Sequence, residues 1–256
     1  MNGAFYIGAI GLDAQQRALE VVANNVANVN TAAFKRSTVQ FSELVAPLRG
    51  ADDLVLQPGG PSYLQGVTLS GTPLVWSQGA MQQTGQPMDI AINGEGFIEL
   101  AGPSGRSLLW RGGALKINSD GYLATASGVL LRAMISVPQE TTAITIGADG
   151  AVTAMVGDEG AAQQIGQIDL VTVKTPDMLV DTGNGYFEAQ SESQLAVVKP
   201  GDDGAGFIVQ GSLEGSNVQL VDEMTNLLLL QRAFGANAQL VQAGDQLMSL
   251  VNQLRR

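Results

Sequence analysis

The organisation of this chain follows from its C-terminal stretch, which reads, from Ser216 to Arg256, SNVQLVDEMTNLLLLQRAFGANAQLVQAGDQLMSLVNQLRR. The stretch contains no proline, and its start fits a capping box, with a serine followed three residues later by Gln219. Met224 lies beside a stripe of apolar residues that recur at every seventh position, namely Leu220, Leu227, Phe234, Val241 and Met248. This pattern predicts one long amphipathic helix that packs against other helices.

The same stretch carries small residues on several faces of the predicted helix, at Ala233, Gly235, Ala236, Ala238, Ala243 and Gly244. Each interior glycine costs a helix up to about 1 kcal/mol relative to alanine. Close approach by a neighbouring helix would explain why glycines are retained there. We therefore favour self-assembly through this helix over a closed intramolecular two-helix hairpin, which remains the alternative.

The N-terminus predicts a second amphipathic helix, in which Phe5, Leu12, Leu19 and Val26 recur at intervals of seven. It runs into an asparagine-rich segment that includes Asn24, Asn25, Asn28 and Asn30, and asparagine favours caps and turns. Two helices with the same periodicity are expected to pack as a coiled coil, with each other or with copies of themselves.

The middle of the chain predicts strands. Residues 32–78 are rich in proline and glycine and indicate an extended arm or loose hairpin. Residues 79–211 alternate short apolar pieces with turns, and Asp120-Gly121 and Asp149-Gly150 each lie between β-forming residues, which is typical of hairpins. We expect an α+β chain: an N-terminal helix at 1–31, the arm at 32–78, a central all-β domain at 79–211 and a C-terminal helix at 212–256.

Composition excludes several classes of function. Only 14% of the residues are charged and the net charge is −11, which argues against nucleic acid and anionic membrane surfaces as partners. The chain has no cysteine and no histidine, so disulfides, thiol nucleophiles, most zinc sites and histidine acid–base chemistry are absent. No lysine or arginine precedes Arg17, so we expect no cleaved signal peptide, and no apolar run is long enough to span a membrane.

The candidate chemical sites have simpler structural interpretations. Asp202 and Asp203 lie between glycines but lack the alternating ligands of a calcium loop. The aspartates of the two Asp-Gly pairs are explained by their turns rather than by glycosidase chemistry. Trp76 and Trp110 could line a sugar-binding groove, although core or edge packing is the commoner role. We expect no catalytic, cofactor or metal site, and therefore no enzyme.

The residues at both ends resemble a known family. The run Ala23–Thr31 followed by Phe34-Lys35-Arg36 is similar to the N-terminal signature of bacterial flagellar rod and hook proteins, and Gln210–Val218 followed by Gln231–Phe234 is similar to their C-terminal signature. Two departures are Ala32-Ala33, where the family usually has a glycine, and Trp110-Arg111-Gly112-Gly113. The signature residues are Asn24, Asn25, Ala27, Asn28, Phe34, Lys35, Gly211, Glu214, Ser216, Asn217, Val218 and Arg232.

The resemblance implies a structural subunit that is secreted by the flagellar export apparatus and polymerises helically, with its helices inside and its β-domain outside. Its implied partners are copies of itself, other axial proteins of the rod and hook, and the surrounding ring that acts as a bushing. The arm around Gln57-Pro58-Gly59 resembles the distal-rod branch, and a proximal rod or hook-like subunit is the alternative. From another class, a secreted β-rich adhesin or sugar-binding module with a helical stalk remains a hypothesis.

Overall fold

The computed structural model describes residues 2–46, 64–102, 105–157, 161–189 and 195–254. Side chains at 2–7, 43–46, 64–66, 247–248, 250–252 and 254 are outside that description. The chain forms two compact units. The first comprises residues 1–27, 37–75 and 219–256, and the second comprises residues 28–36 and 76–218.

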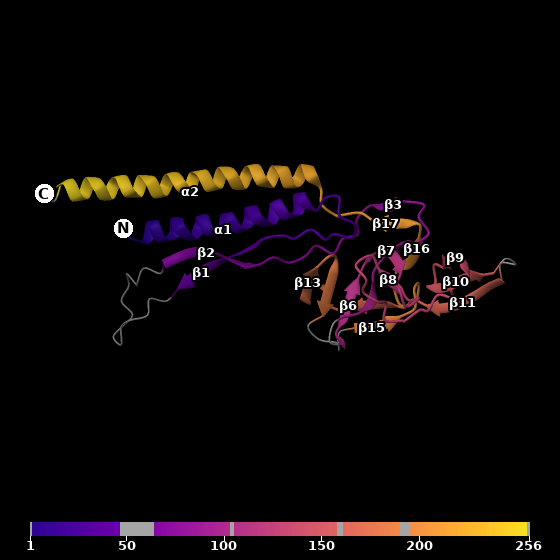
Figure 1. Ribbon diagram of the computed structural model, residues 1–256. Helices are drawn as coiled ribbons and strands as arrows, with labels where there is room; N and C mark the ends of the chain where they lie inside the picture. Colours follow the sequence, from indigo (N-terminus) through magenta and orange to yellow (C-terminus); the bar gives the residue numbers. More distant parts are fainter. Residues whose placement is uncertain (1, 47–63, 103–104, 158–160, 190–194, 255–256) are drawn as a thin grey trace, which may run out of the picture. The chain divides into compact units, whose positions relative to one another are not determined.

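The first unit is built on two helices, α1 (Asn2–Ala27) and α2 (Leu220–Leu254), which lie side by side (Figure 1). They are antiparallel, because Gly8 lies beside Val241 while Asn25 bonds to Glu223. Strand β1 (Gln40–Ala46) pairs antiparallel with β2 (Leu64–Gly71), and β2 packs against α1. The two predicted helices are therefore present, and their packing as a true coiled coil stays a prediction.

The start of the C-terminal helix differs from the capping-box prediction. The helix begins at Leu220 rather than after Ser216, and the Ser216 hydroxyl accepts a hydrogen bond from the Val218 amide at 3.2 Å within a turn. Residues 212–214 belong to the predicted helical segment 212–256, but they form the strand β17. The cause is tertiary: contacts between Asn217 and segments far away in the chain hold this stretch outside the helix.

The second unit is almost entirely β. Its largest sheet has the strand order β13-β14-β6-β5-β12-β15, with bounds Leu179–Gly183, Tyr186–Ala189, Ser107–Trp110, Phe97–Ala101, Leu170–Val173 and Leu195–Val198. A four-stranded sheet has the order β16-β4-β7-β8, with bounds Phe207–Gln210, Asp89–Asn93, Gly112–Ile117 and Leu123–Thr125.

Two smaller sheets complete this unit. One has the order β11-β10-β9, with bounds Ala161–Gln167, Ala151–Val156 and Thr141–Ile146. The other pairs β17 (Ser212–Glu214) with β3 (Met81–Gln83), and a short 3₁₀ turn, η2, spans Pro176–Met178. The six-, four- and three-stranded sheets share one apolar core, whose fully buried members include Ile90, Ile92, Leu100, Leu123, Leu170 and Ile208.

Both predicted Asp-Gly hairpins are confirmed. Strand β7 pairs with β8 across Asp120-Gly121, and β9 pairs with β10 across Asp149-Gly150. In each case the glycine adopts a positive φ, 81° at Gly121 and 83° at Gly150, which is why glycine follows the aspartate. Trp110 is buried in the core, and Trp76 packs edge-on against Phe187 at 4.9 Å between ring centroids.

Candidate assembly site: a helix pair and a buried charge cluster

The face of α1 that meets α2 is made mainly of small residues. Its buried positions follow a spacing of three or four residues, at Gly8, Gly11, Ala14, Ala18, Val22 and Asn25. A Cβ atom on Gly8 would lie 2.8 Å from Val241 Cγ2, and one on Gly11 would lie 3.0 Å from Asn237 Nδ2. Both glycines therefore allow the two helix backbones to approach more closely than larger residues would.

The heptad residues that we predicted as interface positions lie beside that face rather than at its centre. In α1, Leu12, Leu19 and Val26 are half-buried, and in α2, Leu227 and Val241 are half-buried. The remaining described members of the α2 stripe are exposed, namely Leu220, Met224 and Phe234. The side chains of Phe5 and Met248 lie outside the described residues. Much of the predicted apolar stripe is thus left uncovered within the chain.

Further large apolar side chains of α2 are exposed on other faces. Val221 is 77% exposed, Leu228 is 56% exposed and Leu240 is 67% exposed, and Leu229 is also exposed. Residues 221 and 228 are seven positions apart and lie on one face of the helix. Residues 229 and 240 lie together on a second face, about a quarter of a turn away. The exposed apolar surface of α2 therefore extends over more than one of its faces.

Asn25, one of the signature asparagines, links the C-terminal end of α1 to other segments of the first unit by hydrogen bonds. Asn25 is 1% exposed, and its Nδ2 donates to the Ser37 carbonyl at 2.8 Å and to Glu223 Oε2 at 3.3 Å. Its Oδ1 accepts from the Ser37 amide at 3.0 Å. One side chain therefore joins α1, the chain that returns after residue 36, and the first turn of α2. Asn24 and Ala27 are exposed, while Asn28 accepts a hydrogen bond from the Thr31 hydroxyl at 3.1 Å.

The second unit holds a buried charge cluster, which we define as Lys35, Arg111 and Glu214. The Glu214 side chain is fully buried, and Lys35 Nζ donates to its Oε1 at 2.6 Å. Arg111 donates to Oε2 from Nε at 3.1 Å and from Nη2 at 3.0 Å. The Gly79 amide also donates to Oε1, at 3.0 Å. Glu214 therefore receives four hydrogen bonds from three separate segments, and this satisfies a carboxylate that water cannot reach.

The charge cluster contains two cations, Lys35 and Arg111, but only one carboxylate, Glu214. Burial lowers the pKa of Lys35 below its ordinary value of 10.5, because the loss of hydration outweighs the attraction of Glu214, and Arg111 adds repulsion. Lys35 Nζ also donates to the Ser77 carbonyl at 3.0 Å, and Arg111 Nη1 donates to the Gly96 carbonyl at 2.7 Å. Backbone carbonyls thus supply part of the negative potential that these two cations require.

Asn217 makes a second set of contacts near the cluster. Its Oδ1 accepts from the Arg36 amide at 2.7 Å, and its Nδ2 donates to the Ser77 carbonyl at 3.0 Å. Its backbone amide donates to the Phe34 carbonyl at 3.4 Å, and Val218 beside it is buried. The N-terminal and C-terminal signatures are therefore brought together by hydrogen bonds within the second unit.

Three other signature positions have different environments. Gly211 adopts a φ of 72°, and its carbonyl accepts from the amides of Thr84 and Gly85. Ser216 makes the turn described above, and Arg232 is exposed on α2. Ala33, which stands where the family usually has glycine, is buried with a φ of 56°, a left-handed backbone conformation that glycine adopts more readily than alanine.

Sequence reasoning missed Arg111 and Glu223 as partners of the signature residues. Arg111 follows three buried apolar residues, Leu108-Leu109-Trp110, and a cation in that setting requires a buried acceptor. The sequence alone does not show which carboxylate supplies it, because Arg111 and Glu214 are 103 positions apart.

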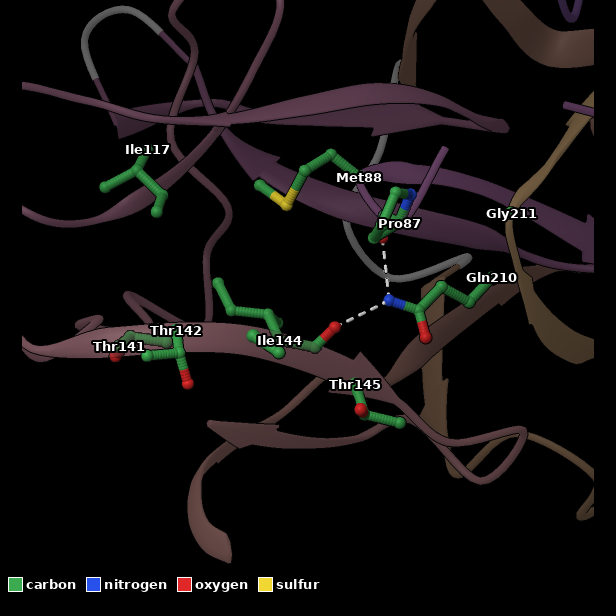
Figure 2. Close-up of a pocket in the computed structure, with 10 residues that line it drawn as sticks. Pro87, Met88, Ile117, Thr141, Thr142, Ile144, Thr145, Gln210 and Gly211 are labelled. Atoms are coloured by element: carbon green, nitrogen blue, oxygen red, sulfur yellow. Dashed lines mark hydrogen bonds between the residues drawn. The ribbon is translucent and has the colours of Figure 1, made fainter. Parts of the chain in front are cut away.

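Among the described residues, no group of histidine, cysteine, aspartate or glutamate side chains could hold a metal ion. A cleft of about 610 Å³ lies along β9 (Figure 2). There Gln210 Nε2 donates to the carbonyls of Pro87 at 2.7 Å and Ile144 at 2.9 Å, and the lining residues are uncharged. This cleft offers no acid–base pair. No described helix is both long enough and apolar enough to cross a membrane.

Three family models match the chain in order along its length. They are the flagella basal body rod protein at residues 5–35, the flagellar hook protein FlgE/F/G D1 domain at 91–154, and the flagellar basal body rod FlgEFG protein C-terminal region at 209–254. The first and last of these matches contain most of the signature residues described above. Lys35 and Glu214 fall in two different matches.

Curated relatives extend the likeness to the whole chain. The flagellar basal-body rod protein FlgG of Agrobacterium fabrum is 35% identical over 98% of each chain, and that of Bacillus subtilis is 32% identical over the full length of both. The flagellar basal-body rod protein FlgF of Caulobacter vibrioides is 30% identical over 94% of this chain and 93% of its own. The chain therefore belongs to the flagellar basal-body rod protein family, as a structural rod subunit of the distal, FlgG type.

Proposed function

We propose that this chain polymerises helically through α1 and α2 into a segment of the flagellar rod that transmits torque from the motor to the hook. The observation that carries the proposal is the exposed apolar surface of α2 at Val221, Leu228 and Leu240. Apolar surface of this kind on a soluble monomer marks an interaction site. A helical polymer would cover it with equivalent surface from neighbouring copies.

Gly235 supports the same proposal. It lies inside α2, and a Cβ atom added there would meet nothing within 4 Å. An interior glycine costs a helix about 1 kcal/mol relative to alanine, and the described part of the chain offers no packing that would explain it. Close approach of a neighbouring helix in the polymer would supply that reason.

The proposed interface includes the heptad positions on both helices. We assign intersubunit contacts to Leu220, Met224 and Phe234, which are exposed, and to the half-buried flank of α1 at Leu12 and Leu19. We also propose Phe5 and Met248 as interface residues on the heptad pattern alone. Small residues on α1 would keep the two helices of one subunit close, while larger apolar residues would face its neighbours.

The proposal has further parts that rest on the family. The chain would be exported through the flagellar export apparatus without a cleaved signal peptide, assemble with proximal rod and hook proteins into a rod that spans the periplasm, and turn inside a surrounding ring. It would have no enzymatic activity. The parts 1–31, 32–78 and 79–211 would serve as inner helix, arm and outer β-domain, and α2 (Leu220–Leu254) would serve as the second inner helix.

Sedimentation velocity on concentrated protein tests the proposal directly. The doubly substituted chain Leu228→Gln with Leu240→Gln should stay monomeric under conditions in which the natural chain forms polymers. Met178→Gln provides a matched control, because Met178 is an exposed apolar residue in the β unit. Circular dichroism would check that helix content is retained. Unchanged polymerisation of the double variant would contradict the proposal.

A further inference from the structure

The second unit contains a cavity of about 280 Å³ that neither the core nor assembly explains. Its walls include Trp76, Phe97 and Arg111, together with the last two residues of β12, Thr172 and Val173, and Lys174 directly after it. The rings of Trp76 and Phe97 meet edge to face, with centroids 5.5 Å apart. The cavity thus combines flat apolar walls with a cation, as small-molecule sites commonly do.

Two hydrogen-bond donors beside the cavity make no hydrogen bond to any described residue. Trp76 Nε1 is buried and has no acceptor. Arg111 has five N–H hydrogens and makes four hydrogen bonds: two to Glu214 and one each to the carbonyls of Gly96 and Ile92. The second hydrogen of Nη1 therefore has no acceptor among the described residues. A buried donor without an acceptor is costly, and an unseen ion or water is a common explanation.

The charges around the cavity favour an anion. The buried cations Lys35 and Arg111 share one carboxylate, Glu214, so the buried cluster carries more positive than negative charge. Lys174 adds a third cation at the rim, and Glu95 opposes it there. Both rim residues are exposed, so either can turn toward solvent. With Glu95 included, the five groups sum to a net charge of one positive unit.

We propose that this cavity binds a carboxylate group. Its two oxygens would accept hydrogen bonds from Arg111 Nη1 and from Trp76 Nε1, and Lys174 would attract it electrostatically. Because Trp76 Nε1 is covered, binding requires a small rotation of that half-buried ring. The volume suits a small aromatic carboxylate or the acidic side chain of another protein, and this inference does not depend on rod assembly.

The two tryptophans of the chain allow a direct test. The full chain, kept dilute and monomeric, would be titrated with benzoate, with uncharged benzamide as the matched ligand, while the two indole N–H signals are followed by ¹H–¹⁵N NMR. Trp76→Phe assigns the signal of Trp76. We expect this signal to move saturably with benzoate and not with benzamide, while the signal of Trp110 stays in place.

Charge variants at the rim supply the second measurement. Lys174→Gln should weaken benzoate binding about two- to fivefold, and Glu95→Gln should strengthen it by a similar factor, since exposed charges contribute modestly. Lys199→Gln is the control, because Lys199 is exposed after β15 and lies outside the cavity lining. A response to benzamide equal to that for benzoate, no saturable shift, or no effect of either rim variant would overturn the proposal.

A capped glutamate, N-acetylglutamate N-methylamide, separates the two sources of the carboxylate. Tighter binding of benzoate would assign a free aromatic carboxylate as the ligand. Tighter binding of the capped glutamate would assign an acidic side chain from another protein. Either result supports a carboxylate site, whereas failure of both ligands to bind would refute it.

Discussion

Replacing Glu214 by glutamine removes the carboxylate on which Lys35 and Arg111 converge. Glutamine has nearly the same shape, so packing is kept, but two buried cations lose their counter-charge. The new amide would also place donor hydrogens against a side chain that only donates. Removing one partner of a buried ion pair costs about 3–5 kcal/mol, which is a large part of the 5–15 kcal/mol that stabilises a typical domain.

Urea unfolding followed by tryptophan fluorescence measures this loss, because Trp76 and Trp110 both lie in the second unit. With a slope of about 2 kcal/mol per M, the midpoint should fall by about 1.5–2.5 M. Glu188→Gln is the matched control. It breaks the pair between Arg106 and Glu188, whose side chains are 64% and 27% exposed, and such a pair contributes about 1 kcal/mol or less. Equal midpoints for Glu214→Gln and Glu188→Gln would refute the reasoning.

Three further predictions concern separate features of the chain. Burial lowers the pKa of Lys35 in the folded chain, whereas in the unfolded chain it stays near 10.5. At pH values between these two, Lys35 is protonated in the unfolded chain and neutral in the folded chain. The stability of the natural chain relative to Lys35→Met should therefore rise with pH through this window, as urea midpoints would show; a constant difference would contradict it. Gly79→Ala places a Cβ against the Gly215 carbonyl oxygen, where there is no room for it, and should cost about 1–3 kcal/mol, whereas Gly71→Ala meets nothing within 4 Å and should unfold thermally like the natural chain. Gly235→Ala should stabilise the monomer by up to about 1 kcal/mol and hinder polymerisation; normal polymers would remove the proposed reason for that glycine.

The terminal helices and the two Asp-Gly hairpins were predictable because their signals are local. Apolar residues at intervals of seven lie on one side of a helix, so they predict it from the local sequence. Asp-Gly between β-forming residues favours the tight turn that joins two antiparallel strands. The start of α2 was not predictable in this way. Ser216 and Gln219 fit a cap, but Asn217 is bonded to Arg36 and to Ser77, and the propensity of a short window contains no information about partners 140 or 181 positions away.

Several strands escaped prediction for related reasons. Strand β11, AAQQIGQ, lacks both alternation and β-branched residues apart from Ile165, and its pairing with β10 supplies its structure. Strand β17 is three residues long and exists through β3. The charge cluster likewise depends on the fold, because Lys35, Arg111 and Glu214 come from three distant segments. The signature pointed to Lys35 and Glu214, while Arg111 stood out only as a departure from the family pattern.

The central claim is that the exposed faces of α2 become covered when the chain assembles. The natural chain has no cysteine, so single cysteines at Val221, Leu228 or Leu240 would report on their own positions. The account predicts rapid maleimide labelling of each in the dilute monomer and strong protection in the polymer, while a cysteine at Met178 stays reactive in both. Equal labelling of the three α2 positions before and after polymerisation would contradict the account.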